Sequence, residues 1–175
     1  MQLDVLDHFR EIIEPAIADF EQAEAELTAA SQGGDEQQLR GVAFRALRLG
    51  GAAALYLHHF ADIVAHRPPD HFPAFKGSAD DVRAWLLAEG ASDLALLTDV
   101  ADALKHAVLT RRLPREVEEA GQVLTASRGY GVGRFGEGKF GGVDEVWILA
   151  KSGQRPLNTL LRSVHRTWER VLLGG

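Results

Sequence analysis

The sequence predicts a mainly α fold, a bundle of four or five helices with a β-hairpin inserted before the last helix. Apolar residues recur at three- and four-residue steps through most of residues 3–110 and again from about Pro156 to Leu173, the period of helices that bury one face. Two β-prone runs lie together at about 117–151, on either side of a glycine-rich segment. The chain has 175 residues, enough for one sizeable core, so we expect a single domain spanning 1–175.

The first helical pattern covers residues 3–30, where Leu6, Phe9 and Ile13 are among the apolar residues that repeat at helical spacing. Pro15 interrupts this pattern. Because proline has no backbone N–H, we expect it either to kink one helix or to start a second helix in its first turn. The segment Ser31 to Gly34 then ends this helical region.

The next helix is predicted from Glu36 to about Ala65, with Gly50 and Gly51 near its middle. A glycine in a helix interior costs on the order of 1 kcal/mol relative to alanine. We therefore expect the pair to permit either the close approach of a neighbouring element or a bend. Three prolines within residues 68–73 end this helix with a stiff, extended connection.

Two shorter helices are predicted after the proline-rich connection. Ser78 begins a sequence that resembles a capping box, and the helix it starts is expected to stop at Gly90. Ser92 is the expected N-cap of a helix from Asp93 to about Thr110. The strands of the hairpin are expected within 117–127 and 143–151, with the glycine-rich stretch 129–142 as its tip.

Composition excludes several classes of function. The chain contains no cysteine, which rules out disulfides, thiolate metal sites and a catalytic cysteine. No secretory signal pattern is visible at the N-terminus, and the longest apolar run, Leu49 to Leu57, is too short to span a bilayer. We therefore expect a cytoplasmic protein without a membrane partner.

Charge is unevenly distributed along the chain. Residues 1–35 carry nine acidic side chains against one basic side chain, whereas residues 105–175 carry twelve Lys or Arg against seven Asp or Glu. This asymmetry is compatible with an anionic partner for the C-terminal part or with a homodimer of unlike halves, and both stay open.

Two matching segments within the predicted helices point to chemistry. One carries His59, Asp62 and His66, and the other carries Asp99, Asp102 and His106. In each, the polar side chains are three and then four residues apart, so they share one face of a helix. Carboxylates and imidazoles are the usual ligands of zinc, iron and manganese. The six residues therefore predict a divalent-metal site, in which an unligated aspartate would be the general base for a metal-bound water.

Departures from known metal motifs favour a second interpretation of the same residues. Ferritin-like bundles use glutamates and a Glu-x-x-His motif, whereas the acids here are aspartates and the step to histidine is four. A His-Asp dipeptide and a His-Glu-x-x-His motif are both absent. In the second interpretation the residues form a structural polar seam, in which each Asp pairs with the His four residues later. Lys105, an arginine such as Arg45 or Arg48, or a proton would supply the balancing charge.

The glycine-rich tip contains a Gly131-x-Gly133-x-x-Gly136 pattern, which is found in dinucleotide-binding and kinase loops. A dinucleotide loop must lead into a helix, but here a strand follows, and no other kinase motif is present. Arg134 and Lys139 are the candidate phosphate contacts on this tip. The alternative is a hairpin tip whose aromatic residues pack on the bundle or on a second subunit.

The run from Asp99 to Leu109, followed by the glycine-rich hairpin and a tryptophan-bearing last helix, resembles small bacterial helical proteins of unassigned function over about residues 93–173. The helical part is also similar to HEPN bundle domains, some of which are RNases. Their hallmark is an arginine followed after four to six residues by a histidine. The nearest pair here, Arg67 and His71, has three intervening residues, so the resemblance implies no RNase activity.

The sequence thus leaves three functions open. The first is a non-catalytic binding or interaction module with a polar His/Asp seam. The second is a divalent-metal-dependent, hydrolase-like enzyme that uses the His/Asp cluster. The third is nucleotide or nucleic-acid binding through the hairpin tip, which ranks below the other two because a glycine pattern alone is a weak signal.

Overall fold

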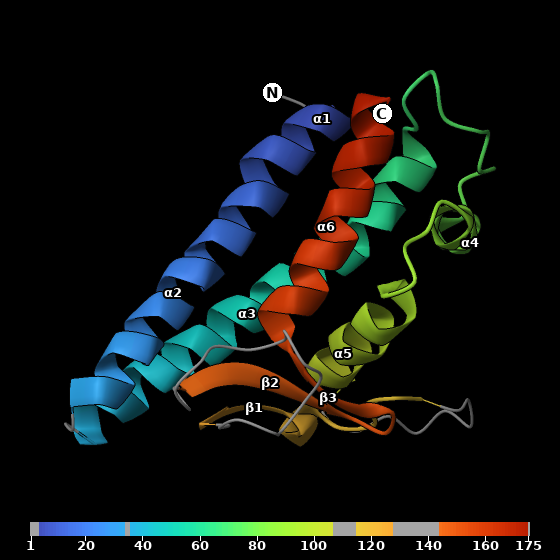
Figure 1. The fold of residues 1–175 in the computed structure, drawn as a ribbon. Coiled ribbons are helices and arrows are strands. Elements are labelled where there is room, and N and C mark those ends of the chain that lie inside the picture. Colours follow the sequence, from blue (N-terminus) through green and yellow to red (C-terminus); the bar gives the residue numbers. More distant parts are fainter. Residues whose placement is uncertain (1–3, 34–35, 107–114, 128–143, 175) are drawn as a thin grey trace.

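The computed structural model describes residues 4–33, 36–106, 115–127 and 144–174 (Figure 1). It confirms a mainly α fold with a small antiparallel sheet before the C-terminal helix. The long helix α3, Glu36–His66, is central and packs against α2, α4, α5 and α6. The described ends of the chain, in α1 and α6, lie together at the end of the bundle opposite the sheet (Figure 1).

The N-terminal helical region has three parts, α1 (Val5–His8), a π-helical turn (Phe9–Ile13) and α2 (Glu14–Gly33). The Glu14 N–H donates to the Phe9 carbonyl five residues earlier. Because α2 begins at Glu14, Pro15 lies in its first turn, which is the predicted alternative in which the proline starts a second helix. Its missing N–H leaves the ordinary hydrogen bond to the residue 11 carbonyl unmade, and the wider π turn sits at that gap.

The close approach predicted at Gly50 is confirmed. A Cβ atom built on Gly50 would lie 2.8 Å from both Leu157 Cδ2 and Phe20 Cε2, closer than real Cβ atoms come to their neighbours. Phe20 belongs to α2, and Leu157 is the first residue of α6 (Leu157–Leu173). The glycine therefore lets two helices pack onto α3 at one point, which is one of its two predicted roles.

Helix α4 follows its predicted signals, and α5 begins one residue after its predicted start at Asp93. α4 covers Ala79–Ala88, and the Ser78 hydroxyl accepts a hydrogen bond from the Asp81 N–H at 3.2 Å. α5 covers Leu94–His106, and the rest of the helix predicted to reach Thr110 lies outside the described residues. The chain reverses between the two helices at Gly90, whose φ of +99° favours glycine.

The sheet has three antiparallel strands in the order β1 (Val123–Ser127), β2 (Asp144–Ala150) and β3 (Gly153–Pro156). A two-stranded hairpin was expected, so the third strand corrects the prediction. In the register of β2 and β3, Gly153 lies opposite Ala150 at one end and Pro156 lies opposite Trp147 at the other. Its sequence, Gly-Gln-Arg-Pro, has little β propensity, and the tight turn that precedes it sets the pairing.

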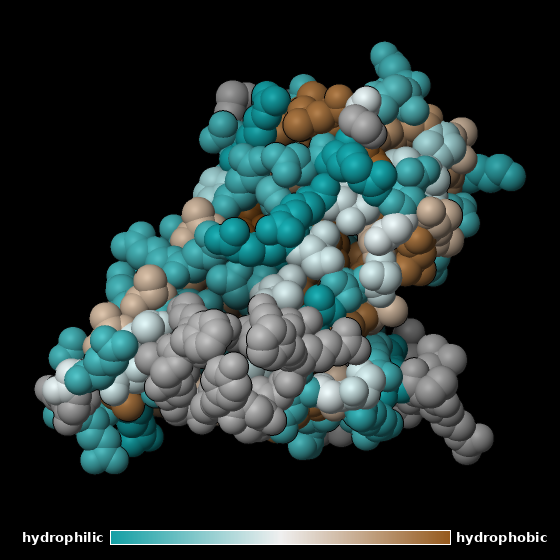
Figure 2. Space-filling view, in the orientation of Figure 1, coloured by the Kyte–Doolittle hydropathy of each residue, from teal (hydrophilic) through white to brown (hydrophobic). Residues whose placement is uncertain are grey.

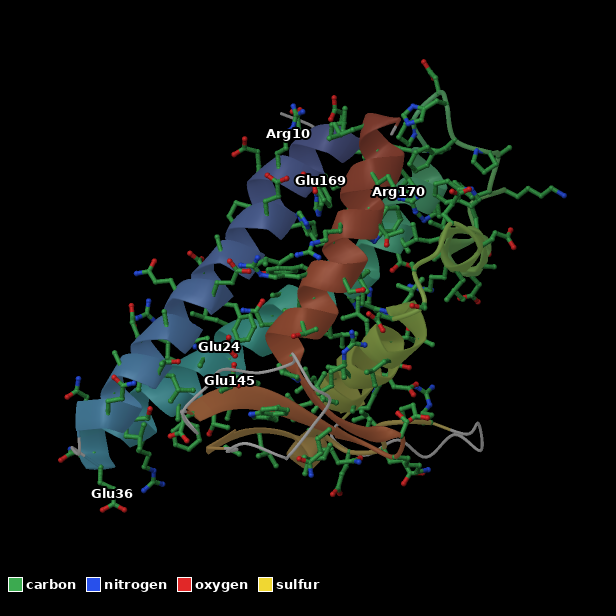
Figure 3. The ribbon with its side chains drawn as sticks, viewed as in Figure 1. Arg10, Glu24, Glu36, Glu145, Glu169 and Arg170 are labelled. Atoms are coloured by element: carbon green, nitrogen blue, oxygen red, sulfur yellow. The ribbon has the colours of Figure 1, made fainter. Side chains whose placement is uncertain are left out.

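The sheet is joined to the helices by a buried glutamate in the middle of α2. Glu24 is 1% exposed, and its carboxylate accepts hydrogen bonds from the Val146 N–H (3.2 Å) and the Asn158 side-chain amide (3.1 Å). β3 ends opposite Trp147, so no strand residue is paired with Val146 on that side of β2. Glu145 is also buried, and its side chain lies next to Glu24 in Figure 3.

α6 completes the core with a strongly one-sided apolar face. Its fully or nearly fully buried residues include Leu157, Leu160, Leu161, Val164, Trp168 and Leu172. Within the described parts of the chain, no helix is both long and apolar enough to cross a membrane.

Candidate functional site

The two aspartates of the second matched segment share one arginine. Asp99 and Asp102 lie one turn apart on α5, and Arg115 Nη1 donates to Asp99 Oδ1 at 3.0 Å and to Asp102 Oδ2 at 2.9 Å. Arg115 is 9% exposed. The other oxygen of Asp99 accepts the Glu116 N–H at 2.8 Å. Both oxygens of Asp99 are therefore used, and a single cationic side chain faces both carboxylates.

The first matched segment is balanced by a second arginine. Asp62 Oδ2 accepts a hydrogen bond from Arg83 Nη2 of α4 at 3.3 Å, and His59 Nδ1 lies 3.0 Å from the same oxygen. Arg83 also donates to Asp80 at 3.0 Å, so it links α3 to the start of α4. These carboxylates are partly or largely exposed, so each pair contributes modestly to stability.

His58 lies buried within the seam and was not among the predicted site residues. It is 7% exposed, and its Nδ1 atom is buried without a hydrogen-bond partner among the described residues. The pKa of His58 is lowered to about 4, chiefly by burial and also by the charges of Arg83 and His59. The carboxylates of Asp102 and Asp62 act in the opposite direction. At neutral pH the ring is therefore uncharged.

We expect this ring to make the fold sensitive to acid. The folded-state pKa of about 4 lies below the ordinary value of 6.5, so between these pH values the unfolded chain binds a proton that the folded chain does not. Relative to a His58→Gln variant, the wild-type protein should lose about 2–3 kcal/mol of unfolding free energy between pH 7 and pH 4. Chemical denaturation across this pH range measures the loss. A His59→Gln variant, changed at the exposed neighbouring position, should keep most of this loss, because burial, the largest cause of the lowered pKa, is unchanged. An equal loss of stability in the His58→Gln variant would contradict the assignment.

His66 and His106 are exposed, and neither forms the expected hydrogen bond with the aspartate four residues earlier. In the part of the chain that the structure describes, no group of three or more acidic or imidazole side chains is placed to hold a metal ion. The metal site stays a prediction. Arg134 and Lys139 lie outside the described residues.

A separate concave surface lies between the N-terminal helical region and α6. One hollow of about 180 Å³ is lined by Leu6, Arg10 and Leu172 among others, and a second of about 370 Å³ by Ile17, Arg162 and Arg166 among others. Glu14 and Glu169 line both hollows, so the two hollows form one groove, called the α2–α6 groove below. Hydrophilic side chains cover much of this face in Figure 2, with apolar surface at the end near the termini.

His165 lines the larger of the two hollows. Its ring stacks on Phe9, with centroids 4.9 Å apart and planes at 20°. Burial lowers the pKa of His165, against the raising effect of Glu169 and Glu14. Its Nε2 atom is 3.9 Å from Glu14 Oε1, beyond hydrogen-bond distance. The π turn that contributes Phe9 is a feature often found at functional sites.

Sequence reasoning missed the two arginines that balance the seam. Lys105, Arg45 and Arg48 were expected because they lie close to the matched segments in sequence. Arg115 follows a stretch without helical periodicity, and Arg83 lies one helix away, so no local spacing connects either to the aspartates. Only the need for charge balance around buried carboxylates indicated that an arginine would be present.

Comparison of the chain with protein-family models, with curated proteins and with solved structures finds no match.

Proposed function

We propose that this chain is a non-catalytic binding module, with the His/Asp seam as a structural element and the α2–α6 groove as the binding surface. The observation that carries the proposal is the position of Arg115. Its guanidinium group lies between Asp99 and Asp102, where an ion would have to lie to use both carboxylates. With its charge already present, neither aspartate needs a metal to be stable in a partly buried place.

The groove supports the binding part of the proposal. It combines an aromatic ring, Phe9, with a histidine whose pKa is lowered by burial and with charged side chains from two helices, and titratable groups with shifted pKa values are markers of ligand sites. Within the described part of the chain, the side chains of Arg10, Arg166 and Glu169 form no hydrogen bond or ion pair. They are therefore available to a ligand.

A metal titration tests the structural role of the seam. Adding zinc, manganese or iron(II) to chelator-treated protein should leave the melting temperature unchanged within about 1 °C. A site filled at 100 times its dissociation constant would add about 2.7 kcal/mol, which is roughly 5–10 °C for a chain of this size. The measurement is differential scanning fluorimetry on protein purified without an affinity tag.

Asp102→Asn is the matched variant for this titration. It should melt below the wild type in metal-free buffer, because Arg115 loses one of its charged partners. If a metal instead stabilises the wild type by several degrees and leaves Asp102→Asn unchanged, the seam is a metal centre and the proposal is wrong.

A further inference from the structure

Two large aromatic side chains lie exposed on α3. Phe44 is 60% exposed and Tyr56 is 49% exposed, although α3 is the central helix of the fold. One exposed ring on a surface needs no explanation, but two on the same helix leave a sizeable apolar area in contact with water. They mark the outer side of α3 as a candidate contact surface.

The outer side of α3 is basic as well as aromatic. Residues 37–61 contain three arginines, Arg40, Arg45 and Arg48, and no aspartate or glutamate. All three arginines are exposed. The Arg40 guanidinium carbon lies over the ring of Phe44, 5.7 Å from its centroid. Arg48 follows Phe44 by one helical turn and forms no ion pair within the part of the chain that the structure describes. This side of α3 therefore suits an acidic partner.

The outer side of the neighbouring N-terminal helices has the opposite charge. Glu11, in the π-helical turn, and Asp19, in α2, are exposed, and neither forms an ion pair with any described residue. Figure 1 shows α2 and α3 side by side at the end where they follow one another in the chain. There, Glu26 pairs with Arg45, and both side chains stay partly exposed. The outer sides of the two helices therefore form one continuous surface, called the α2–α3 face below.

Gly41 is a further sign that a partner packs on this face. It lies on the opposite side of α3 from Gly50, since nine residues make about two and a half helical turns. The cost of glycine at Gly50 is offset by the close packing of Phe20 and Leu157. A Cβ atom built on Gly41 would meet no described atom within 4 Å, so nothing in the described chain offsets the same cost there. A closely packed second helix would offset it.

Charge on the α2–α3 face favours a second copy of this chain over a nucleic acid as the occupant. A polyanion lying on the arginines would be repelled by the acids of the same face and by the net charge of -6. A second copy, related by a twofold axis that runs along the two helices, would place its α2 on this α3 and its α3 on this α2. Acids then meet arginines twice.

The spacing of the charges fits this arrangement. Because α2 and α3 run in opposite directions and Glu26 is level with Arg45, Arg48 is level with Ala23. Asp19 lies about one turn further along α2. A twofold axis along the helices keeps these levels, so Arg48 of one copy comes within about one turn of Asp19 of the other.

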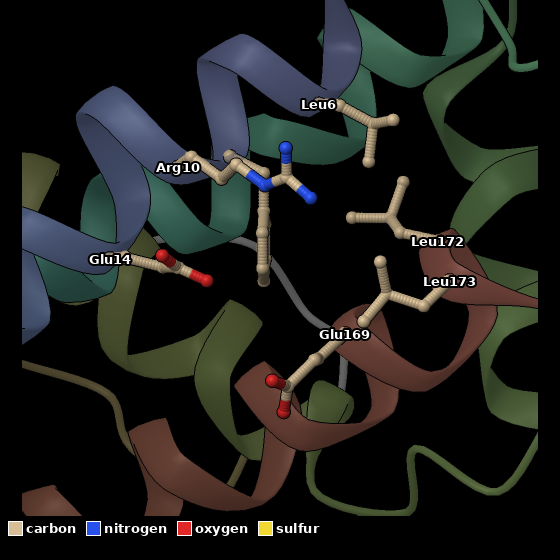
Figure 4. Close-up of a pocket in the computed structure, with 7 residues that line it drawn as sticks. Leu6, Arg10, Glu14, Glu169, Leu172 and Leu173 are labelled. Carbon is tan, nitrogen blue, oxygen red and sulfur yellow. The ribbon is translucent and has the colours of Figure 1, made fainter. Parts of the chain in front are cut away.

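We propose that the α2–α3 face binds a second copy of this chain, with Arg48 of each copy against Asp19 of the other and with Phe44 and Tyr56 covered at the contact. The inference goes beyond the proposed binding function. None of these four residues lines the α2–α6 groove, whose smaller hollow, between the start of α2 and the end of α6, is drawn in Figure 4. Dimerisation therefore leaves the groove open.

Sedimentation velocity on the full chain at low salt tests the proposal. The α2–α3 face is about 30 Å long and two helices wide, at the small end of stable interfaces, so we expect a dissociation constant of about 1–100 µM. Raising the NaCl concentration to about 0.5 M should weaken dimerisation at least roughly threefold, because ion pairs contribute to the contact. A wild-type chain that stays monomeric at about 200 µM would overturn the proposal.

Charge reversal tests the contact itself. Arg48→Glu and Asp19→Lys should each weaken dimerisation by roughly tenfold or more, because each brings like charges together in both halves of the twofold contact. The combined variant restores opposite charges and should recover the wild-type dissociation constant to within about threefold. Failure of the combined variant to recover would overturn the proposal.

Two further variants separate the contact from general effects of charge and folding. Phe44→Ala removes an exposed ring without changing charge and should weaken dimerisation about fivefold. Arg166→Glu makes the same charge change as Arg48→Glu on α6, at an exposed position away from the α2–α3 face, and should leave dimerisation within about twofold. Circular dichroism confirms that each variant is folded. Equal weakening by Arg166→Glu and Arg48→Glu would overturn the proposal.

A single-stranded DNA of about 15 nucleotides, labelled with fluorescein, is the probe for the alternative occupant. Fluorescence anisotropy should show no binding below about 100 µM protein at low salt. Binding that Arg48→Glu abolishes would assign the α2–α3 face to a nucleic acid and overturn the proposal.

Discussion

Replacing Arg115 with methionine should lower the free energy of unfolding by about 2–4 kcal/mol. The change leaves Asp99 and Asp102 one turn apart on α5 without the guanidinium group that both contact. Their side chains are only 15% and 26% exposed, so water compensates poorly for the lost partner. Urea denaturation at pH 7 in the presence of a chelator measures the loss.

Lys105→Met is the matched control for this substitution. Lys105 lies on the same helix and was a candidate for balancing the aspartates, but it is exposed and forms no ion pair with any described residue. Its removal should change stability by less than about 0.5 kcal/mol. A larger loss for Lys105→Met than for Arg115→Met would show that the lysine balances the seam.

Replacing Glu24 with alanine should be about as damaging, with a loss of about 2–4 kcal/mol. The substitution removes the acceptor for the Val146 N–H and the Asn158 amide, and it empties space in a fully buried part of the core. Because the Val146 N–H has no strand residue to replace Glu24, its hydrogen exchange should accelerate before that of the other β2 amides. Hydrogen exchange followed by NMR measures this difference directly.

Two further variants of α2 separate the role of Glu24 from a general effect of charge. Glu24→Gln keeps one acceptor oxygen and the side-chain shape, so it should lose less than half as much stability as Glu24→Ala. Glu26 lies two residues after Glu24 and forms an exposed ion pair with Arg45. Glu26→Gln breaks this pair, which contributes at most about 1 kcal/mol to stability. An equal loss for Glu24→Ala and Glu26→Gln would contradict the anchoring role.

The helices could be predicted from sequence because their signals are local. Ser78 as an N-cap, Gly50 as a point of close approach and Pro15 in a first turn each follow from the chemistry of one residue. β3 could not be predicted, because its four residues gain strand structure only by pairing with β2. The π turn depends on how the missing N–H of Pro15 is accommodated, which the sequence alone leaves open.

The candidate site was predicted less well, because it depends on contacts between distant segments. The spacing of the matched segments drew attention to polar residues on α3 and α5, where Asp62, Asp99 and Asp102 pair with arginines, but it assigned no partner outside those segments. Arg115 lies 13 residues beyond Asp102, and the groove joins residues near both ends of the chain. His165 had no visible role in the sequence, because its stacking partner, Phe9, lies in a different helix.

The most direct test of the central claim, that an arginine balances the seam, is a double-mutant cycle between Arg115 and Asp102. Stability is measured by urea denaturation in chelator for the wild type, Arg115→Met, Asp102→Asn and the double variant. We predict a favourable coupling of about 1–3 kcal/mol, so that the double variant is more stable than the sum of the single losses implies. Additive losses, with no coupling between the two residues, would contradict the account.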